Sequence, residues 1–371
     1  PALEAFLAAI ERDVKDPSKR RKVKANLNEN QLNFIKKVKS EFPNKGLRIR
    51  REDKGPRFVI VGALEEDDKI LAELSNDTYF TETNQDPFED YIEEIKFWAA
   101  EKLENEEIDE KQFNLITNID DSHLAIPKPL YKTHKKNAQG NMVNPVPIRS
   151  LTVGCGTPVH PLSKVMQLGI KHLTSKEELP HNAPSTKSVL KELVEINETQ
   201  TPLPDDSILA LADIEKMYPN TDVEEGLRSI ERRLATNPSP LGLSPETIVS
   251  GLRICLRCNC VKFKDSFFLP TRGVPMGSCV SCDFTDIWMG DVTEKHVTTN
   301  PVQTLKFILY RDDAWDILVQ KEEQRIFIDH LQNLHPNLTW TVETGSEGGY
   351  LYLWITIEDG RIHWRNFKKA P

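Results

Sequence analysis

The sequence contains no apolar stretch long enough to cross a membrane, and it lacks the cysteine density of a secreted, disulfide-bonded protein. Only six of the 371 residues are cysteines, and no segment has the features of a signal peptide. These absences favour a reducing, intracellular setting. Because the first residue is Pro1, we expect the natural start to lie upstream.

The chain also lacks the positive net charge that is common among nucleic-acid-binding proteins. Its 57 acidic and 48 basic residues give a net charge of −9. The distribution of charge matters more than its sum, because a single basic face is sufficient to bind a phosphate backbone. Basic residues are frequent in residues 19–57, whereas acidic residues dominate 65–110. The run Lys19 to Lys24 could be a nuclear import signal or a solvated basic run at a helix end.

The order of predicted elements favours an α+β fold with a sheet backed by helices on one face. Apolar residues at helical spacing predict helices within residues 1–50. A helix is also expected at 86–104, with Asp86 as its N-cap and Pro87 at its first position. Further helices are predicted at 165–173, 188–196, 222–233, 244–255, 279–297 and 320–331. Strands are predicted at 57–62, 207–212, 304–310, 338–343 and 350–357, a hairpin at 260–269, and strands with loops over 127–158.

Three aspartates are the strongest catalytic candidates in the sequence. Asp213 ends one apolar strand, and Asp312-Asp313 follow another in the segment KFILYRDD. Carboxylates from separate strand ends can hold two divalent ions, which activate a primer 3′-hydroxyl and stabilise leaving pyrophosphate. Mg²⁺ suits such a site because phosphate oxygens and water complete its shell. Since most Asp-Asp pairs are solvated turns, the preceding apolar strand and nearby tyrosine are what favour a metal site.

Two further features lie between these aspartates in the order a polymerase would need. Tyr218 follows Asp213 closely, so its ring could exclude a 2′-hydroxyl and select deoxynucleotides, or it could simply be half-buried. Arg272 to Ser278 (RGVPMGS) is a glycine-proline turn before a helix, where the backbone can approach a base pair or phosphate closely.

The cysteines offer a competing site. Cys255 with Cys258, and Cys279 with Cys282, have the spacing of a structural zinc module. The second pair falls where a helix must pack after the GVPMGS segment, and cysteine is often simply buried. We therefore expect no structural zinc, but we keep a zinc-stabilised nucleic-acid-binding module as an alternative.

In this order, the strand aspartate with its tyrosine, GVPMGS and YRDD resemble motifs A, B and C of reverse transcriptases. The details are most similar to the Penelope-like retroelement branch, with its DKG, PKIHK-like, RPI, DVxxLYTNIP, hPNIxFTxE and LpFLDv segments. The corresponding segments here are 53–55, 131–135, 147–150, 213–221, 335–343 and 351–355. The resemblance covers roughly residues 53–370, and the ordered set is more specific than any single member.

The sequence departs from the family pattern at several positions, none of which removes a metal ligand. Arg149 follows the Pro-Ile pair instead of preceding it, Trp354-Ile355 replaces Leu-Asp, and Arg311 occupies the variable site of the YxDD box. Cys279 and Cys282 stand where prolines are frequent. The thumb and GIY-YIG endonuclease of many relatives are not in this sequence, so we expect a fragment or an endonuclease-lacking element.

The resemblance implies a right-hand polymerase with fingers and palm, whose antiparallel palm sheet is backed by helices. The implied divisions are a helical basic extension (1–52), fingers (53–205) and palm (206–371). The implied ligands of Mg²⁺, or of Mn²⁺ as a substitute, are Asp213, the Ile214 carbonyl, Asp312 and Asp313. The implied nucleotide-binding residues are Lys54, Lys132, Arg149, Ile214, Tyr218, Pro275 and Gly277. The basic members would neutralise the triphosphate, or they could be ordinary surface charge. His134 could contact phosphate or be structural, and the Trp354 region would grip the primer.

The implied function is an RNA-directed DNA polymerase of a Penelope-like retrotransposon, which extends a DNA primer on an RNA template with dNTPs. An RNA-templated RNA polymerase is an alternative, although Tyr218 argues against it. A catalytically silent descendant that only binds RNA is another, although the three aspartates are intact.

Overall fold

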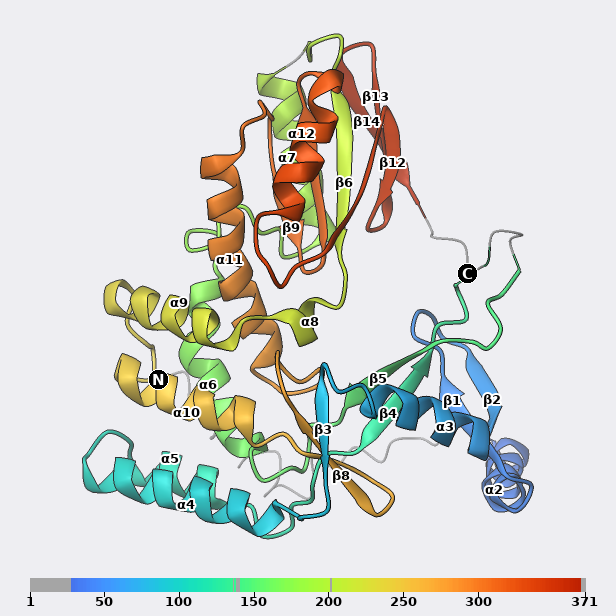
Figure 1. Ribbon diagram of the computed structural model, residues 1–371, viewed down its shortest axis with the longest axis vertical. Coiled ribbons are helices and arrows are strands. Elements are labelled where there is room, and N and C mark those ends of the chain that lie inside the picture. Colours follow the sequence, from blue (N-terminus) through green and yellow to red (C-terminus); the bar gives the residue numbers. More distant parts are fainter. Residues whose placement is uncertain (1–27, 136, 138–140, 201, 368–371) are drawn as a thin grey trace.

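A computed structural model describes residues 28–135, 137, 141–200 and 202–367 of the chain (Figure 1). The elements up to residue 200 are α2 (Glu29–Asn44), β1 (Leu47–Arg51), β2 (Phe58–Gly62), α3 (Ala63–Leu74), β3 (Phe80–Thr83), α4 (Phe88–Glu104), α5 (Glu110–Thr117), β4 (Pro127–Tyr131), β5 (Ile148–Thr152), α6 (His160–Ile170), η2 (Lys171–Thr174) and α7 (Thr186–Thr199). Those after it are β6 (Ile208–Ile214), α8 (Met217–Asn220), α9 (Val223–Thr236), α10 (Pro245–Arg257), β7 (Val261–Phe263), β8 (Ser266–Pro270), α11 (Ser281–Thr299), β9 (Ile308–Tyr310), β10 (Asp313–Leu318), η3 (Lys321–Glu323), α12 (Gln324–Gln332), β11 (Trp340–Gly345), β12 (Glu347–Tyr350), β13 (Leu353–Glu358) and β14 (Arg361–Asn366).

A four-stranded antiparallel sheet, in the order β11-β6-β10-β9, lies at one end of the long axis of the molecule (Figure 1). Side chains alternate between its faces, so one face of β6 carries Ile208, Ala210 and Ala212. This face shares a core with α11 and α12, to which Trp288 and Phe327 contribute. The expected sheet backed by helices is therefore present.

The opposite face of this sheet is covered only in part. Leu209 and Trp315 share a core with α7 and with the small antiparallel sheet β12-β13-β14. Gly348 of β12 is needed here, because a Cβ on it would lie 2.3 Å from the Leu211 side chain. Farther along the same face, Leu211 is half-buried and Asp213 is exposed. The cover therefore thins toward Asp213, while the Tyr350 hydroxyl of β12 still donates to the Asp313 carbonyl at 3.1 Å.

A second core joins helices that are far apart in the sequence. Ile95 of α4 and Met166 of α6 lie in one buried cluster with Ile230 of α9 and Leu252 of α10. Phe284 and Ile287, near the start of α11, belong to the same cluster. Because α11 continues into the core under the four-stranded sheet, this helix connects the two packed regions.

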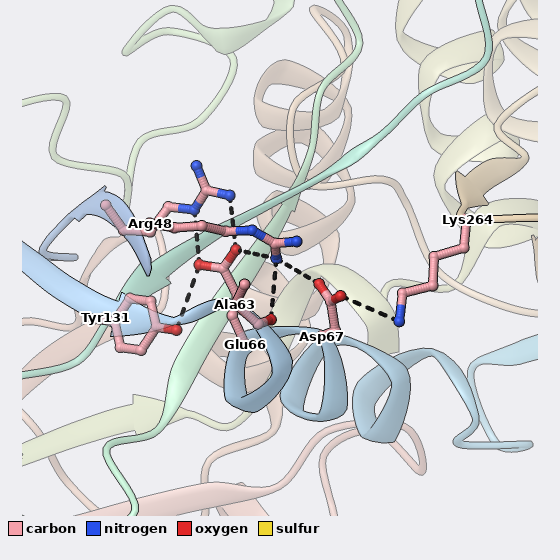
Figure 2. Close-up of polar contacts among 7 residues, drawn as sticks. Arg48, Ala63, Glu66, Asp67, Tyr131 and Lys264 are labelled. Atoms are coloured by element: carbon pink, nitrogen blue, oxygen red, sulfur yellow. Dashed lines mark hydrogen bonds and ion pairs between the residues drawn. The ribbon is translucent and has the colours of Figure 1, made fainter. Parts of the chain in front are cut away.

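The remaining sheets are small and lie beside α3 (Figure 1). They are β1-β2, β4-β5 and β3-β8-β7. The buried Glu66 of α3 joins two of them: it accepts hydrogen bonds from Arg48 of β1 at 2.9 Å and from the Tyr131 hydroxyl of β4 at 3.5 Å (Figure 2). It also accepts from Arg50 of β1 at 2.7 Å. The neighbouring Asp67 pairs with Arg48 and with Lys264 of the β7–β8 turn.

Most of the predicted elements are confirmed, with several corrections. Residues 47–51 form a strand instead of continuing a helix, because Gly46 follows the end of α2 with a left-handed backbone. Pro87 is the N-cap of α4, although the Asp86 side chain does accept from the Phe88 amide. The strand predicted at 304–310 is confined to β9, and the one predicted at 350–357 is interrupted by a turn where Leu351 has φ +52°. No prediction was made for α3, β3, α5, α8, β10, β12 or β14.

The predicted helix near Leu3 and the basic run Lys19 to Lys24 lie outside the described residues. Within the described residues, the helices are all too short or too polar to span a bilayer.

Candidate active site

Asp213 and Asp313 lie directly opposite each other on β6 and β10. The amide of the next residue, Ile214, donates to the Asp312 carbonyl at 2.9 Å. Because bonded and non-bonded pairs alternate in an antiparallel ladder, Asp213 and Asp313 form a non-hydrogen-bonded pair, with Cα atoms about 4.5 Å apart. Their side chains therefore project side by side from the uncovered end of the sheet.

Asp312 belongs to the turn that joins β9 to β10. Tyr310 pairs with Asp313, so Arg311 and Asp312 form a two-residue connection, and Arg311 has φ +59°. In an antiparallel ladder, the amide and carbonyl of one residue face the same neighbouring strand. The Ile214 carbonyl therefore faces β10 at the position of Asp312, as expected for a backbone ligand beside these carboxylates.

This donor set fits Mg²⁺. Like charges placed directly opposite on neighbouring strands destabilise a sheet, and a divalent cation beside Asp213 and Asp313 would offset that cost. Three carboxylates and a backbone carbonyl are hard oxygen donors, which suit Mg²⁺ better than soft metals.

Tyr218 lies on α8, the short helix that follows Asp213. The chain turns sharply before it, because Lys216 adopts a left-handed conformation with φ +49°. The tyrosine hydroxyl is 3.2 Å from the Cys282 sulfur, and its ring is packed partly into both helix-containing cores. Burial, and then the contact with Cys282, raises the pKa of Tyr218.

The GVPMGS loop packs tightly against its neighbours through glycines. Gly277 has φ +129°, and a Cβ there would lie 2.0 Å from the Thr152 carbonyl oxygen. Gly273 has φ +71°, and its Cβ would lie 2.3 Å from the Pro219 carbonyl oxygen. Pro275 accepts a hydrogen bond from the Ser281 hydroxyl at 2.6 Å through its carbonyl. The loop therefore lies between the end of β5 and α8, and its nucleotide-positioning role stays a prediction.

The predicted triphosphate-binding cations come together around Asp53. The Arg149 guanidinium lies 3.5 Å from the Asp53 carboxylate, which is 2% exposed. Burial and then Arg149 lower the pKa of Lys132, while burial and then Lys54 lower the pKa of His134. Three separate segments thus bring their positive charges within electrostatic reach of one another.

Sequence reasoning missed the acidic partners of these cations. One Asp53 oxygen has no hydrogen-bond partner within the described part of the chain. Burial raises the pKa of Glu73 on α3, whereas Lys132, Ser150 and Lys216 oppose that rise. The DKG segment already contained Asp53, but no sequence pattern pointed to Glu73.

The remaining candidate residues lie elsewhere. Trp354 of β13 donates to Glu347 at 2.9 Å, and its ring lies beside the Arg365 guanidinium and the tilted ring of Phe367. Cys255 and Cys258 are buried in the helical core, Cys279 is half-buried and Cys282 is exposed, and among the described residues the cysteines form no group of three metal-type ligand atoms.

Among the described residues, Asp222, Glu225 and His335 bring three metal-type ligand atoms together. Hydrogen bonds within the protein account for the positions of these three side chains. The imidazole of His335 accepts from the Asn337 amide at 3.1 Å, so its other nitrogen carries the proton and donates to Glu225 at 3.0 Å. Both ring nitrogens are thus used, and Asp222 caps α9. The cluster stabilises the approach to β11.

An antiparallel sheet with carboxylates at adjoining strand positions, backed by helices and facing a separate group of small sheets, defines a right-hand polymerase fold. Solved telomerase structures share it. Telomerase from Candida tropicalis truncated from its C-terminal domain matches with a TM-score of 0.57 and 12% identity, over 89% of this chain and 66% of its own. Apo telomerase from Candida tropicalis matches with 0.59 and 10% identity, over 86% and 56%. Telomerase from Candida albicans in complex with a telomeric RNA fragment matches with 0.59 and 10%, over 89% and 55%.

This likeness establishes the fold, and the Penelope-like branch stays a prediction. The chain spans between about half and two thirds of these telomerase chains. No protein-family model and no curated protein matches the sequence.

Proposed function

We propose that this chain is the fingers and palm of an RNA-directed DNA polymerase of the Penelope-like type. The observation that carries the proposal is the pairing of Asp213 with Asp313 across two strands, with Asp312 in the adjoining turn. Like charges directly opposite each other on neighbouring strands destabilise a sheet. Metal ions bound for nucleotidyl transfer would offset the repulsion between these two carboxylates.

In the proposed reaction, the primer 3′-oxygen attacks the α-phosphorus of a dNTP. The bond from that phosphorus to the bridging oxygen breaks, pyrophosphate leaves, and the hydroxyl proton passes to solvent. Asp213, Asp312, Asp313 and the Ile214 carbonyl would hold Mg²⁺, which activates the nucleophile and stabilises the leaving group. Lys132 and Arg149, with Lys54, would neutralise the triphosphate.

The other residues would position the substrates. Tyr218 would exclude a ribose 2′-hydroxyl, and Pro275 with Gly277 would place template and nucleotide against each other. The region of Trp354 would hold the DNA primer. We propose fingers at 53–205 and palm at 206–371, preceded by a basic extension at 1–52. The similar telomerase that was solved with telomeric RNA supports an RNA template.

The test is primer extension on an RNA template with dNTPs and Mg²⁺, in the longest natural version of the protein. We expect Asp312→Asn to lower the extension rate by roughly 10³-fold or more, because a metal ligand loses its charge. Asp329→Asn, at an exposed position on α12, is the matched control and should extend at the wild-type rate.

Two outcomes would favour the alternatives. Absence of extension in the wild type, with RNA binding unchanged by Asp312→Asn, would support a silent RNA-binding descendant. Efficient extension with rNTPs and little with dNTPs would support an RNA polymerase.

A further inference from the structure

Arg311, at the variable position of the YRDD segment, extends from the β9–β10 turn to helix α11. It donates to the Cys282 carbonyl at 3.2 Å and forms an ion pair with the Asp286 carboxylate. Both partners lie in the first two turns of α11, immediately after the GVPMGS loop. The charged side chain of Arg311 thus links the turn that contains Asp312 to this helix.

The same part of α11 contacts Tyr218, the candidate residue for excluding a ribose 2′-hydroxyl. The Tyr218 hydroxyl contacts the Cys282 sulfur at 3.2 Å, and the Tyr218 carbonyl accepts from the Val274 amide at 2.9 Å. Cys282 therefore contacts Tyr218 through its side chain and Arg311 through its carbonyl. The three segments that would surround a nucleotide meet at this residue.

The backbone at Arg311 favours a role for its side chain. With φ +59°, the residue occupies the left-handed region, where glycine or asparagine is less strained. Burial raises the pKa of Asp286 to about 6, and Arg311 opposes the rise. The ion pair therefore offsets two costs, the strained backbone and the desolvated carboxylate.

We propose that the Arg311–Asp286 ion pair positions Tyr218 through Cys282 and thereby sets the discrimination between deoxynucleotides and ribonucleotides. This inference rests on the proposed polymerase function and deepens it. Arg311, Asp286 and Cys282 are positioning residues, since Tyr218 alone would touch the sugar. When the ion pair is lost, the start of α11 and the tyrosine ring gain freedom, and a 2′-hydroxyl can be accommodated.

The experiment measures kcat/KM for one dNTP and for the matching rNTP on the same primer and RNA template. Asp286→Ala and Arg311→Met should each reduce the dNTP-to-rNTP ratio by roughly tenfold. Cys282→Ala should reduce it as well, whereas Cys282→Ser keeps a hydrogen-bonding group and should restore most of the ratio. Because Cys282 is exposed, these last two variants test the proposal even if the charged variants fail to fold.

Arg232→Met is the matched control. Arg232 also pairs with a carboxylate of α11, Asp291 at 2.6 Å, but contacts no part of the tyrosine network, so the ratio should not change. If the variants lower both activities equally and leave the ratio unchanged, this inference is overturned while the polymerase stands. If the wild type extends no primer with either nucleotide, the proposed function is overturned and this inference with it.

Discussion

His296 is a buried ionisable group in the core under the four-stranded sheet. It lies on α11, is 1% exposed, and contacts the rings of Phe307, Phe327 and His330. Neither ring nitrogen has a hydrogen-bond partner within the described part of the chain. Burial, and then the neighbouring histidines His330 and His181, lowers its pKa to about 3. The imidazole is thus neutral in the folded protein.

This burial predicts a loss of stability in acid. Below pH 6.5, the usual pKa, His296 becomes protonated in the unfolded chain but stays neutral in the folded protein. The free energy of unfolding therefore falls as pH decreases toward 3. Down to pH 4, we expect this residue to contribute roughly 3 kcal/mol to that fall. Urea unfolding of wild type and His296→Phe between pH 7 and pH 4 measures it, since the variant should lose stability less steeply.

The exposed His363 of β14 is the control position. His363→Phe should leave the shape of the pH profile as in the wild type. Parallel profiles for wild type and His296→Phe would contradict the assignment of acid sensitivity to the buried ring.

The contrast between predicted and unpredicted site residues has a physical reason. Asp213 and Asp313 could be found because each is adjacent to an apolar strand, and strand ends are visible in the sequence. The roles of Glu73 and Asp286 could not, since each lies on a helix and faces a cation from a distant segment. Only the folded chain brings such partners together.

At the scale of elements, helix α3 depends on one carboxylate. The side chain of Glu66 is fully buried, and its two arginine partners, Arg48 and Arg50, are about one third exposed. Removing one member of a buried ion pair leaves uncompensated charge, which costs about 3 kcal/mol. We therefore expect Glu66→Ala to lower the free energy of unfolding of the region around β1, β2 and α3 by this amount, measured by urea unfolding or hydrogen exchange.

The neighbouring residue on the same helix is the control. Glu65 pairs with Lys69 one turn away, but its side chain is 58% exposed, so Glu65→Ala should cost at most about 0.5 kcal/mol. Equal losses in the free energy of unfolding for the two substitutions would show that the buried network stabilises the protein no more than the exposed pair.

Most elements after residue 207 were predictable, because apolar strands and amphipathic helices alternate there with clear caps such as Asp222 and Ser244. The short helix α8 and the strands β10, β12 and β14 were missed. Helix α3 was not, since its buried face is built from the charged side chains Glu66 and Asp67 as well as Ile70 and Leu74. Strand β1 was missed for a similar reason: Arg48 and Arg50 alternate with apolar residues and point toward the carboxylates of α3. Hydrophobic periodicity cannot predict a helix or strand whose inward-facing side chains are charged.

At the scale of the whole molecule, the end of β5 and the GVPMGS loop are joined by main-chain contacts. The Thr152 amide donates to the Met276 carbonyl at 2.8 Å, and Gly154 lies against the Gly277 carbonyl. Gly277→Ala would insert a methyl group into the Thr152 carbonyl at a left-handed position. We expect it to cost at least roughly 3 kcal/mol and to abolish primer extension, as measured by thermal unfolding and the polymerase assay.

Gly242→Ala separates steric conflict from backbone preference. Gly242 also has a positive φ, +72°, but no atom lies within 4 Å of its would-be Cβ. It should cost only about 1–2 kcal/mol and leave extension intact. A comparable loss in both variants would mean that the contact with Thr152 is dispensable.

Main-chain contacts of this kind affect how such a protein can evolve. The contacts from Ile214 to Asp312, Val274 to Tyr218 and Thr152 to Met276 all use amides and carbonyls that every residue except proline supplies. Side chains around them can drift with little effect on how the segments are placed, provided that glycine persists at Gly273 and Gly277. An architecture joined in this way can outlast nearly all of its sequence, which agrees with a shared fold at 10–12% identity.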